Sequence, residues 1–234
     1  MTTLLLHPIG LDRSTWDGVP IPDAMAVDLP GHGEAPLGGV ASLAEVADAV
    51  VDGLPTTDPV DVVGLSLGGM VGLHLALRHP GRVRSLVVAC APAATRPDVF
   101  VQRALDTEGQ GMEGMMAATL ARWFSPAVLA AAPPARIVGD TVARLRSDDP
   151  HVVARYWRML ADHDVVARLG ELSMPVTVVA GDRDLSVPPA LARELAEGID
   201  GARYVELGGA HMLHLEAPAP FGGAVSQHLA GVPV

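Results

Sequence analysis

The chain has 234 residues, of which 49% are hydrophobic and 18% charged, so it can form one large domain with a sizeable core, or a core with an insertion. Its formal net charge of −11 argues against binding to nucleic acids or anionic membranes, because phosphate groups attract basic surfaces. A small molecule is the expected partner, and the composition says nothing about oligomeric state.

The single cysteine and the first residues bear on the cellular compartment. Cys90 has no second thiol to pair with, so we expect no internal disulfide and no metal or redox role, but a small buried residue near a strand end. Residues 1–8 lack the basic and long apolar regions of a signal peptide, and no apolar run approaches the roughly 20 residues of a membrane span. We therefore expect a cytoplasmic protein.

Short apolar runs alternate along the chain with longer segments of helical period. The predicted strands are residues 2–6, 24–27, 60–63, 83–89, 176–180 and 202–205. The predicted helices are residues 43–54, 67–78, 190–198 and 220–229. This alternation predicts the α/β class, with a parallel sheet covered by helices on both faces.

Residues 93–172 interrupt this alternation, because they contain helical stretches but no convincing strand. We interpret this segment as a helical cap inserted into a core formed by residues 1–92 and 173–234. Ligands bind open parallel sheets at the carboxyl ends of the strands, so a cap at that end would wall a pocket. The alternative is that the extra helices cover the sheet without any role in a pocket.

Residues 64–68, Gly-Leu-Ser-Leu-Gly, match the pattern G-x-S-x-G between a predicted strand and a predicted helix. In this strand-turn-helix context the turn is so tight that the residues two positions before and two positions after the serine must be small, and the Ser66 hydroxyl is exposed in a strained conformation. The alternative is a glycine-rich turn with an incidental serine. We predict that Ser66 is a nucleophile.

A serine hydroxyl needs a base, and the base needs an acid to orient it. The predicted strand 176–180 is followed by Asp182 and Asp184, and the strand 202–205 is followed by a glycine-rich loop that contains His211. Both loops lie at carboxyl ends of strands, near Ser66. His211 is the expected base, and either carboxylate can be the acid.

Two backbone N–H groups are expected to stabilise the negative oxygen that forms during attack at a carbonyl. One belongs to Leu67, which follows the nucleophile, and the other to Ile9 in the loop after the first strand, since Pro8 has no N–H. We expect no metal site: His211 and His214 can share a helical face, but no further ligands with suitable spacing accompany them.

These motifs resemble, in order, those of the α/β-hydrolase superfamily over nearly the whole chain. The resemblance implies Ser66 as nucleophile, His211 as base and, from the Gly-x-x-Asp pattern, Asp184 as acid with Asp182 as second choice. It implies an α/β-hydrolase fold with about six strands, without the antiparallel strands that usually precede the first one. The usual His-Gly pair of the oxyanion loop is His7-Pro8 here. Residues 120–126 and 159–164 are similar, more narrowly, to β-ketoadipate enol-lactone hydrolases.

The function implied is cleavage of a small carboxylic ester or lactone, such as an enol-lactone, through an acyl-enzyme and without a cofactor. An acyltransferase or perhydrolase with the same triad is the alternative, and a non-catalytic ligand receptor is a third. In the cap, Arg122 beside Trp123 is a candidate for binding a substrate carboxylate. Arg122 can equally be a solvated helix residue or pair with a carboxylate of the cap.

Overall fold

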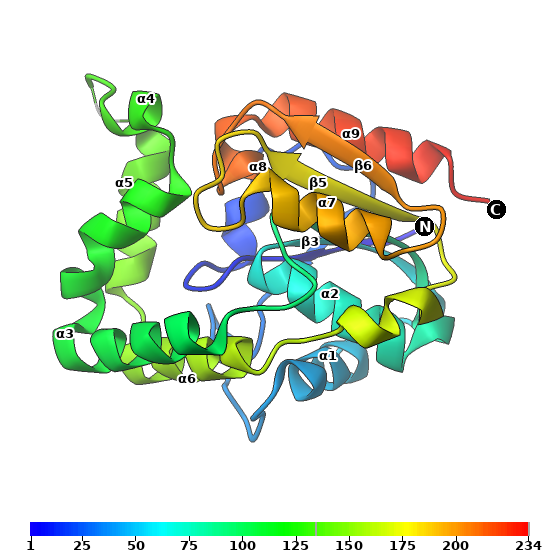
Figure 1. The fold of residues 1–234 in the computed structure, drawn as a ribbon, viewed down its shortest axis with the longest axis horizontal. Helices are drawn as coiled ribbons and strands as arrows, with labels where there is room; N and C mark the ends of the chain where they lie inside the picture. Colours follow the sequence, from blue (N-terminus) through cyan, green and yellow to red (C-terminus); the bar gives the residue numbers. More distant parts are fainter. Residues whose placement is uncertain (134, 234) are drawn as a thin grey trace.

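The fold is built on a parallel sheet, seen edge-on among its helices in Figure 1; the computed structural model describes residues 1–133 and 135–233. The strands are β1 (Thr3–Leu6), β2 (Ala24–Val27), β3 (Val60–Leu65), β4 (Val83–Ala89), β5 (Val176–Gly181) and β6 (Arg203–Leu207). Their order is β2-β1-β3-β4-β5-β6, and every pairing is parallel. The predicted α/β class with about six strands is confirmed.

The helices that connect the strands begin and end close to the predicted positions. They are α1 (Leu43–Asp52), α2 (Leu67–Arg78), α7 (Pro189–Glu197) and α9 (Pro218–Ala230). The short helix α8 (Leu213–Glu216), which precedes α9, was not predicted. Three 3₁₀ turns complete this part: η1 (Arg13–Trp16), η2 (Pro80–Arg82) and η3 (Val166–Glu171). Helix α1 begins after Ser42, whose hydroxyl accepts the N–H of Glu45, while the Glu45 carboxylate accepts the N–H of Ala41.

The register of the strands shows that α2 and α9 lie on opposite faces of the sheet. Val62 on β3 pairs with Leu86 on β4, and Gly72 of α2 approaches both side chains. Thr177 on β5 pairs with Val87, one position along, so it points to the other face. There its hydroxyl lies 2.8 Å from Nδ1 of His228 on α9. The sheet is therefore a middle layer between helices.

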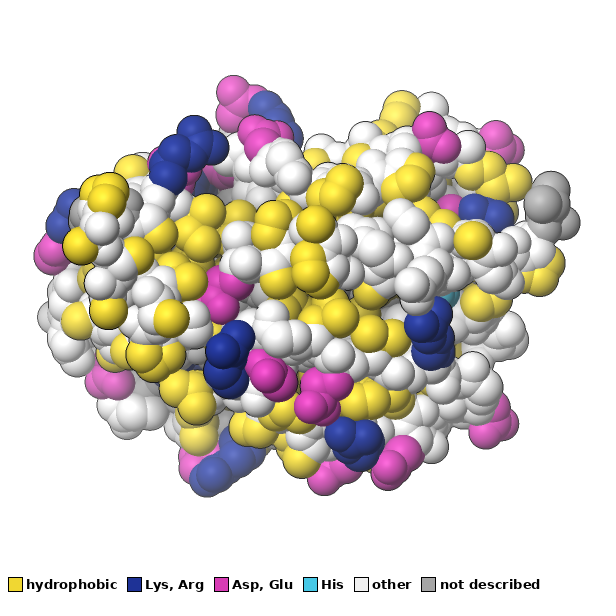
Figure 2. Space-filling view, turned by 90° about the horizontal axis from the view of Figure 1, so that it is seen from above, with side chains coloured by type: hydrophobic (Ala, Val, Ile, Leu, Met, Phe, Trp, Pro, Cys, Tyr) yellow, Lys and Arg dark blue, Asp and Glu magenta, His cyan; other side chains and the backbone are white. Residues whose placement is uncertain are grey.

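Strands β1, β3 and β5 are buried along their whole length and β4 is buried except at Arg84, whereas the edge strands β2 and β6 are partly exposed. Strands covered on both faces are largely apolar, which explains runs such as Val-Thr-Val-Val-Ala-Gly in β5. On the face shown in Figure 2, hydrophobic side chains spread over the middle, and arginines alternate with carboxylates around them. None of the described helices combines the length and apolar character needed to span a bilayer.

Four helices lie between β4 and β5, at one end of the molecule in Figure 1: α3 (Pro97–Trp123), α4 (Pro126–Leu129), α5 (Arg136–Arg146) and α6 (Pro150–Ala161). Helix α3 bends at Gly111, whose φ of +66° is not helical, so it has two arms. A single bridge between Ala94 and Asp164 joins the chain where it enters and leaves these helices.

Candidate active site

Ser66 lies in the turn between β3 and α2, in a backbone conformation that is rare for a residue with a side chain. Its φ is +55° and its ψ −115°, a strain of about 1–3 kcal/mol that persists only where the surroundings enforce it. A Cβ on Gly64 would lie 2.1 Å from the carbonyl oxygen of Gly68, and one on Gly68 would lie 2.1 Å from that of Leu6. Both glycines are therefore required for the turn.

Ser66, His211 and Asp184 lie in one line of hydrogen bonds at the carboxyl ends of β3, β6 and β5. The Ser66 hydroxyl is 2.9 Å from Nε2 of His211, and Nδ1 of His211 is 2.7 Å from Oδ2 of Asp184. Because a carboxylate only accepts, Nδ1 carries the hydrogen and Nε2 is free to accept from the serine. All three residues are buried.

The structure distinguishes the two carboxylates that follow β5. Asp184 is buried, and its Oδ1 accepts the N–H groups of Ser186 and Val187 at 2.7 and 2.9 Å, while Oδ2 faces His211. Asp182 is exposed and accepts the N–H of Gly209 at 2.8 Å. Asp184 therefore orients the imidazole, and Asp182 holds the loop that carries it.

Ile9 and Leu67 lie on either side of Ser66. Ile9 contributes to the wall of the same cavity as Ser66 and His211, and the close approach of Gly68 to Leu6 brings the first turn of α2 against the end of β1. Within residues 1–133 and 135–233, neither the N–H of Ile9 nor that of Leu67 donates a hydrogen bond. Both N–H groups are available to an oxygen bound next to Ser66.

His7, whose role the sequence did not indicate, fixes the loop that contains Ile9. Its Nε2 accepts the N–H of Leu29 at 2.9 Å, so Nδ1 carries the hydrogen and donates to the carbonyl of Pro8 at 2.8 Å. Burial lowers the pKa of His7 to about 4, and the ring is neutral. Since C=O and N–H point in opposite directions across a trans peptide, holding the Pro8 carbonyl sets the direction of the Ile9 N–H.

Residues 3–224 match the alpha/beta hydrolase family. The chain belongs to that family. Among its relatives, a pimeloyl-[acyl-carrier protein] methyl ester esterase from Chromobacterium violaceum is 32% identical over 214 residues, which cover 87% of this chain and 82% of the relative.

Two solved structures extend the comparison within the alpha/beta hydrolase family. A hydrolase from Pseudomonas aeruginosa is 30% identical with a TM-score of 0.91, covering 98% of this chain and 90% of its own. The enol-lactonase from Burkholderia xenovorans is 27% identical with a TM-score of 0.90, covering 97% of this chain and 90% of its own. The expected likeness to enol-lactone hydrolases is confirmed.

A cavity of about 220 Å³ lies over Ser66 and His211, between this alpha/beta hydrolase core and the helices that follow β4. Phe100, Trp123 and Trp157 from those helices contribute to its wall, so the inserted segment borders the site. Arg122 is not a wall residue. It is half-buried, and its one hydrogen bond, to the Thr119 hydroxyl, is long at 3.4 Å.

The loop that carries His211 is tied to the end of α3. Glu216 accepts the N–H of Ser125 at 2.5 Å with one carboxylate oxygen and the N–H of Ala210 at 3.1 Å with the other. In addition, the N–H of Met212 donates to the carbonyl of Trp123 at 3.0 Å. In the sequence these contacts are visible only as Glu216, five residues after His211. Its partner Ser125 is 91 residues away, so the sequence does not indicate the contact.

Cys90 lies directly after β4 with a φ of +50°, buried as expected. Its sulfur and one ligand atom each of Asp184 and His211 lie within 4.8 Å of one another, a set that could also hold a metal ion. However, the Asp184 oxygen and the His211 Nδ1 already hydrogen bond to each other. Burial and the nearby Asp184 raise the pKa of the Cys90 thiol, so it stays protonated beside the carboxylate. His214 contacts Thr15 at 2.7 Å and does not share a ligand position with His211.

Proposed function

We propose that the chain hydrolyses a small carboxylic ester or lactone through an acyl-enzyme, with Ser66 as nucleophile, His211 as general base and Asp184 as the orienting acid. The observation that carries this proposal is the unbroken line of hydrogen bonds from Ser66 through His211 to Asp184. Membership of the alpha/beta hydrolase family and relatives named as an esterase and an enol-lactonase support an enzyme that acts on ester bonds.

The first half of the reaction forms the acyl-enzyme. His211 Nε2 takes the proton of Ser66 as Oγ attacks the carbonyl carbon, and Asp184 stabilises the imidazolium that results. The carbonyl oxygen becomes negative and accepts the N–H groups of Ile9 and Leu67, which together form the oxyanion hole. Loss of one such donor typically costs about 3–4 kcal/mol in the barrier. His211 then protonates the leaving oxygen, and the alcohol departs.

The second half repeats these steps with water. His211 deprotonates a water molecule, which attacks the acyl carbon, and the collapse of the second tetrahedral intermediate returns the proton to Ser66. With a lactone, the leaving alcohol and the acyl group belong to one product, a hydroxy acid or its keto tautomer. These steps use the side chains named, two backbone N–H groups and water.

The cavity supports a small substrate with an apolar part. Its volume of about 220 Å³ is below the roughly 300–1,000 Å³ typical of drug-sized ligands. The apolar wall includes Met70, Val187 and the rings of Trp123 and Trp157. We assign Trp123 to substrate contact, whereas Arg122 acts on the site through its charge.

The proposal is tested by labelling the protein with a fluorophosphonate and by screening short esters and lactones. Labelling of the native protein, its loss in Ser66→Ala, and release of the free acid are the expected results. Absence of labelling and of hydrolysis would contradict the proposal. Adding an alcohol or hydrogen peroxide as competing nucleophile separates hydrolysis from the alternative functions, because an acyltransferase or perhydrolase would form the transfer product in preference to the free acid.

A further inference from the structure

Two arginines border the cavity over Ser66: Arg96, which is exposed and pairs with Asp98 at 3.1 Å, and Arg103 on the first arm of α3. Arg103 contributes to the cavity wall together with Ser66 and His211. Its guanidinium lies 5.0 Å from the centre of the Phe100 ring and 5.3 Å from that of Trp157. Contacts of this kind stabilise a cation over an aromatic face, so the charged group is held in a defined place rather than free in solvent.

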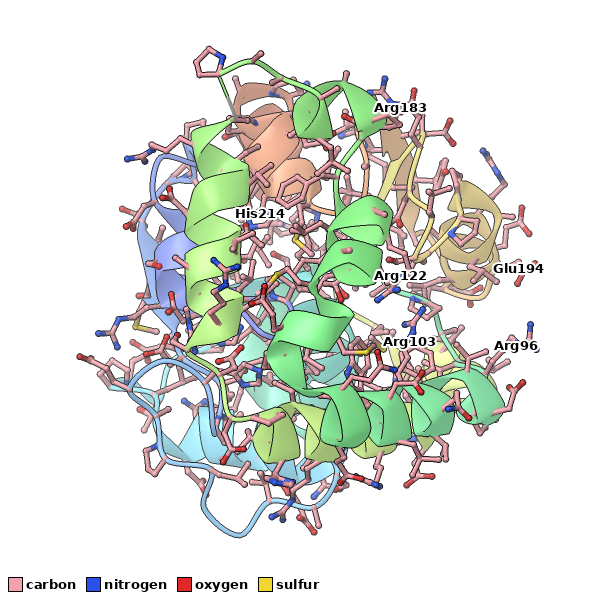
Figure 3. The ribbon with its side chains drawn as sticks, turned by 90° about the vertical axis from the view of Figure 1, so that its left-hand side faces the viewer. Arg96, Arg103, Arg122, Arg183, Glu194 and His214 are labelled. Carbon is pink, nitrogen blue, oxygen red and sulfur yellow. The ribbon has the colours of Figure 1, made fainter. Side chains whose placement is uncertain are left out.

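The charge of Arg103 has no anionic partner. All 16 lysine and arginine positions of the chain are arginines, and the Arg103 guanidinium makes neither a hydrogen bond nor an ion pair within residues 1–133 and 135–233. Its neighbour in space, Arg122, has only the 3.4 Å contact with Thr119. Figure 3 shows the two side chains coming from the two arms of α3 and lying next to each other on the side that faces α7.

Two like charges without partners, both half-buried, are unfavourable for the folded protein. Burial and the charge of Arg122 lower the pKa of Arg103 to about 10, and burial lowers the pKa of Arg122. Both groups still carry a full charge at neutral pH. An anion placed between or beside them would remove the repulsion and supply the missing hydrogen-bond acceptors.

Other arginines of these helices form ion pairs with carboxylates of the protein. Arg146 on α5 binds Glu113 at 2.8 Å, and Arg158 on α6 binds Glu108 at 2.8 Å. The chain contains 27 acidic residues, so carboxylates are not scarce. Among the described arginines, only Arg103 and Arg122 have neither a carboxylate nor a carbonyl oxygen as a side-chain partner, whereas Arg96 at the cavity pairs with Asp98. Two neighbouring guanidinium groups without such an acceptor beside the cavity indicate a site for an anion from outside.

We propose that Arg103, assisted by the charge of Arg122, binds a carboxylate carried by the substrate at a distance from the ester bond. This inference rests on the proposed function and narrows its substrate class to half-esters of dicarboxylic acids and lactones that bear a free acid. Arg103 is the residue that contacts the carboxylate, since it borders the cavity and Arg122 does not. The rings of Phe100 and Trp157 hold the guanidinium in one orientation, so two of its N–H groups can donate to the two oxygens of one carboxylate.

The test compares monomethyl esters of dicarboxylic acids of four to seven carbons with neutral methyl esters of the same chain length. Arg103→Met keeps an unbranched apolar stem in place of the arginine stem but removes the guanidinium charge. It should lower kcat/KM for the best half-ester about ten- to a hundredfold, through KM, and change the neutral esters by less than about twofold. Arg103→Lys should recover part of the loss. Arg146→Met, which removes an equal charge from an outward-facing site of the cap, should change neither class.

A binding measurement keeps this test separate from turnover. Calorimetry of Ser66→Ala with pentanedioate, a product-like dianion, should show binding that disappears on adding Arg103→Met. Equal losses for half-esters and neutral esters, or no binding of pentanedioate, would overturn the inference and leave the proposed hydrolase intact. Failure of fluorophosphonate labelling would instead contradict the hydrolase.

Discussion

The loops at the carboxyl ends of the strands and the helices between β4 and β5 meet at one cavity. The two regions differ in whether their polar side chains near the cavity have hydrogen-bond partners. In the loops, the side chains that align Ser66 and its surroundings, Asp184, His211 and His7, have their hydrogen-bond partners. Asp184 accepts two backbone N–H groups and faces His211, and His7 uses both ring nitrogens. In the helices, Arg103 and Arg122 face the same region without a carboxylate among the described residues.

This difference fits a division in which one region carries out the reaction and the other recognises the substrate. A buried network in which each donor has an acceptor has one favourable geometry, which suits groups that must be aligned before the substrate arrives. A half-buried charge without a partner is stabilised only when a ligand supplies one. On this view the core loops carry out the reaction, and the inserted helices select what enters.

The largest effect is expected from removing the nucleophile or the base. Ser66→Ala and His211→Ala should each lower kcat by about 10⁴-fold or more, and the double variant should lose little beyond either single one, because the residues act as a unit. Hydrolysis rates of the best ester measure this, with thermal unfolding as a check on folding. A Ser66→Ala protein that keeps most of its activity would contradict the assignment.

The next effect separates the two carboxylates after β5. Asp184→Asn should lower kcat by about 10⁴-fold, because the amide no longer holds the His211 tautomer that accepts from Ser66. Asp182→Asn should cost less than about tenfold, since Asp182 contacts only the backbone of Gly209 and neighbouring Arg183. The rates of the two variants on one substrate decide the matter, and the reverse order would move the acid to Asp182.

The core loops could be predicted from the sequence because their motifs contain residues that a particular backbone conformation requires. Gly64 and Gly68 are needed for one turn, and the order of Ser66, the carboxylates and His211 follows the order of the strands. The parallel sheet was predictable for a similar reason, since buried strands show as continuous apolar runs. Local chemistry and strand order together were sufficient for this region.

Contacts between distant segments were not predictable in this way. The sequence near Arg103 does not reveal that Arg122 lies beside it, because the bend at Gly111 brings the two arms of α3 together. The role of Glu216 depends on Ser125, and that of His7 on Leu29. Each of these side chains looks like an ordinary helix or loop residue until the tertiary partner is known.

Acid-sensitive stability is expected because several histidines are withdrawn from solvent. The following buried or half-buried histidines have lowered pKa values: His7, His32, His74, His163, His214 and His228. Burial lowers the pKa of His7 from 6.5 to about 4, so the unfolded chain takes up a proton below pH 6.5 that the folded chain takes up only near pH 4. Stability is therefore full above pH 6.5 and falls as the pH drops towards 4.

The size of this effect is about 2 kcal/mol at pH 5 for one such histidine, or about thirtyfold in the folding equilibrium. Urea unfolding at pH 7, 6 and 5 should show the free energy of unfolding decreasing at each step. His7→Gln should reduce the slope, because glutamine does not titrate. A free energy of unfolding that is constant over this range would contradict this expectation. It would show that the histidines are protonated equally well in the folded and unfolded chain, and therefore that water reaches them in the folded protein.

The smallest effect concerns the place where the two regions are joined. Glu216 holds the N–H of Ser125 at the end of α3 with one oxygen and that of Ala210, which precedes His211, with the other. In Glu216→Gln one of these oxygens becomes an NH₂ group that faces an N–H donor, so one bond is lost and replaced by repulsion. We expect kcat to fall about tenfold with a smaller change in KM, because the position of His211 relative to Ser66 becomes less well defined.

Glu197→Gln, a substitution at an exposed position on α7, is the control. If Glu216→Gln lowered only the melting temperature and left kcat unchanged, Glu216 would stabilise the fold without positioning the base, and the two regions would be independent in catalysis.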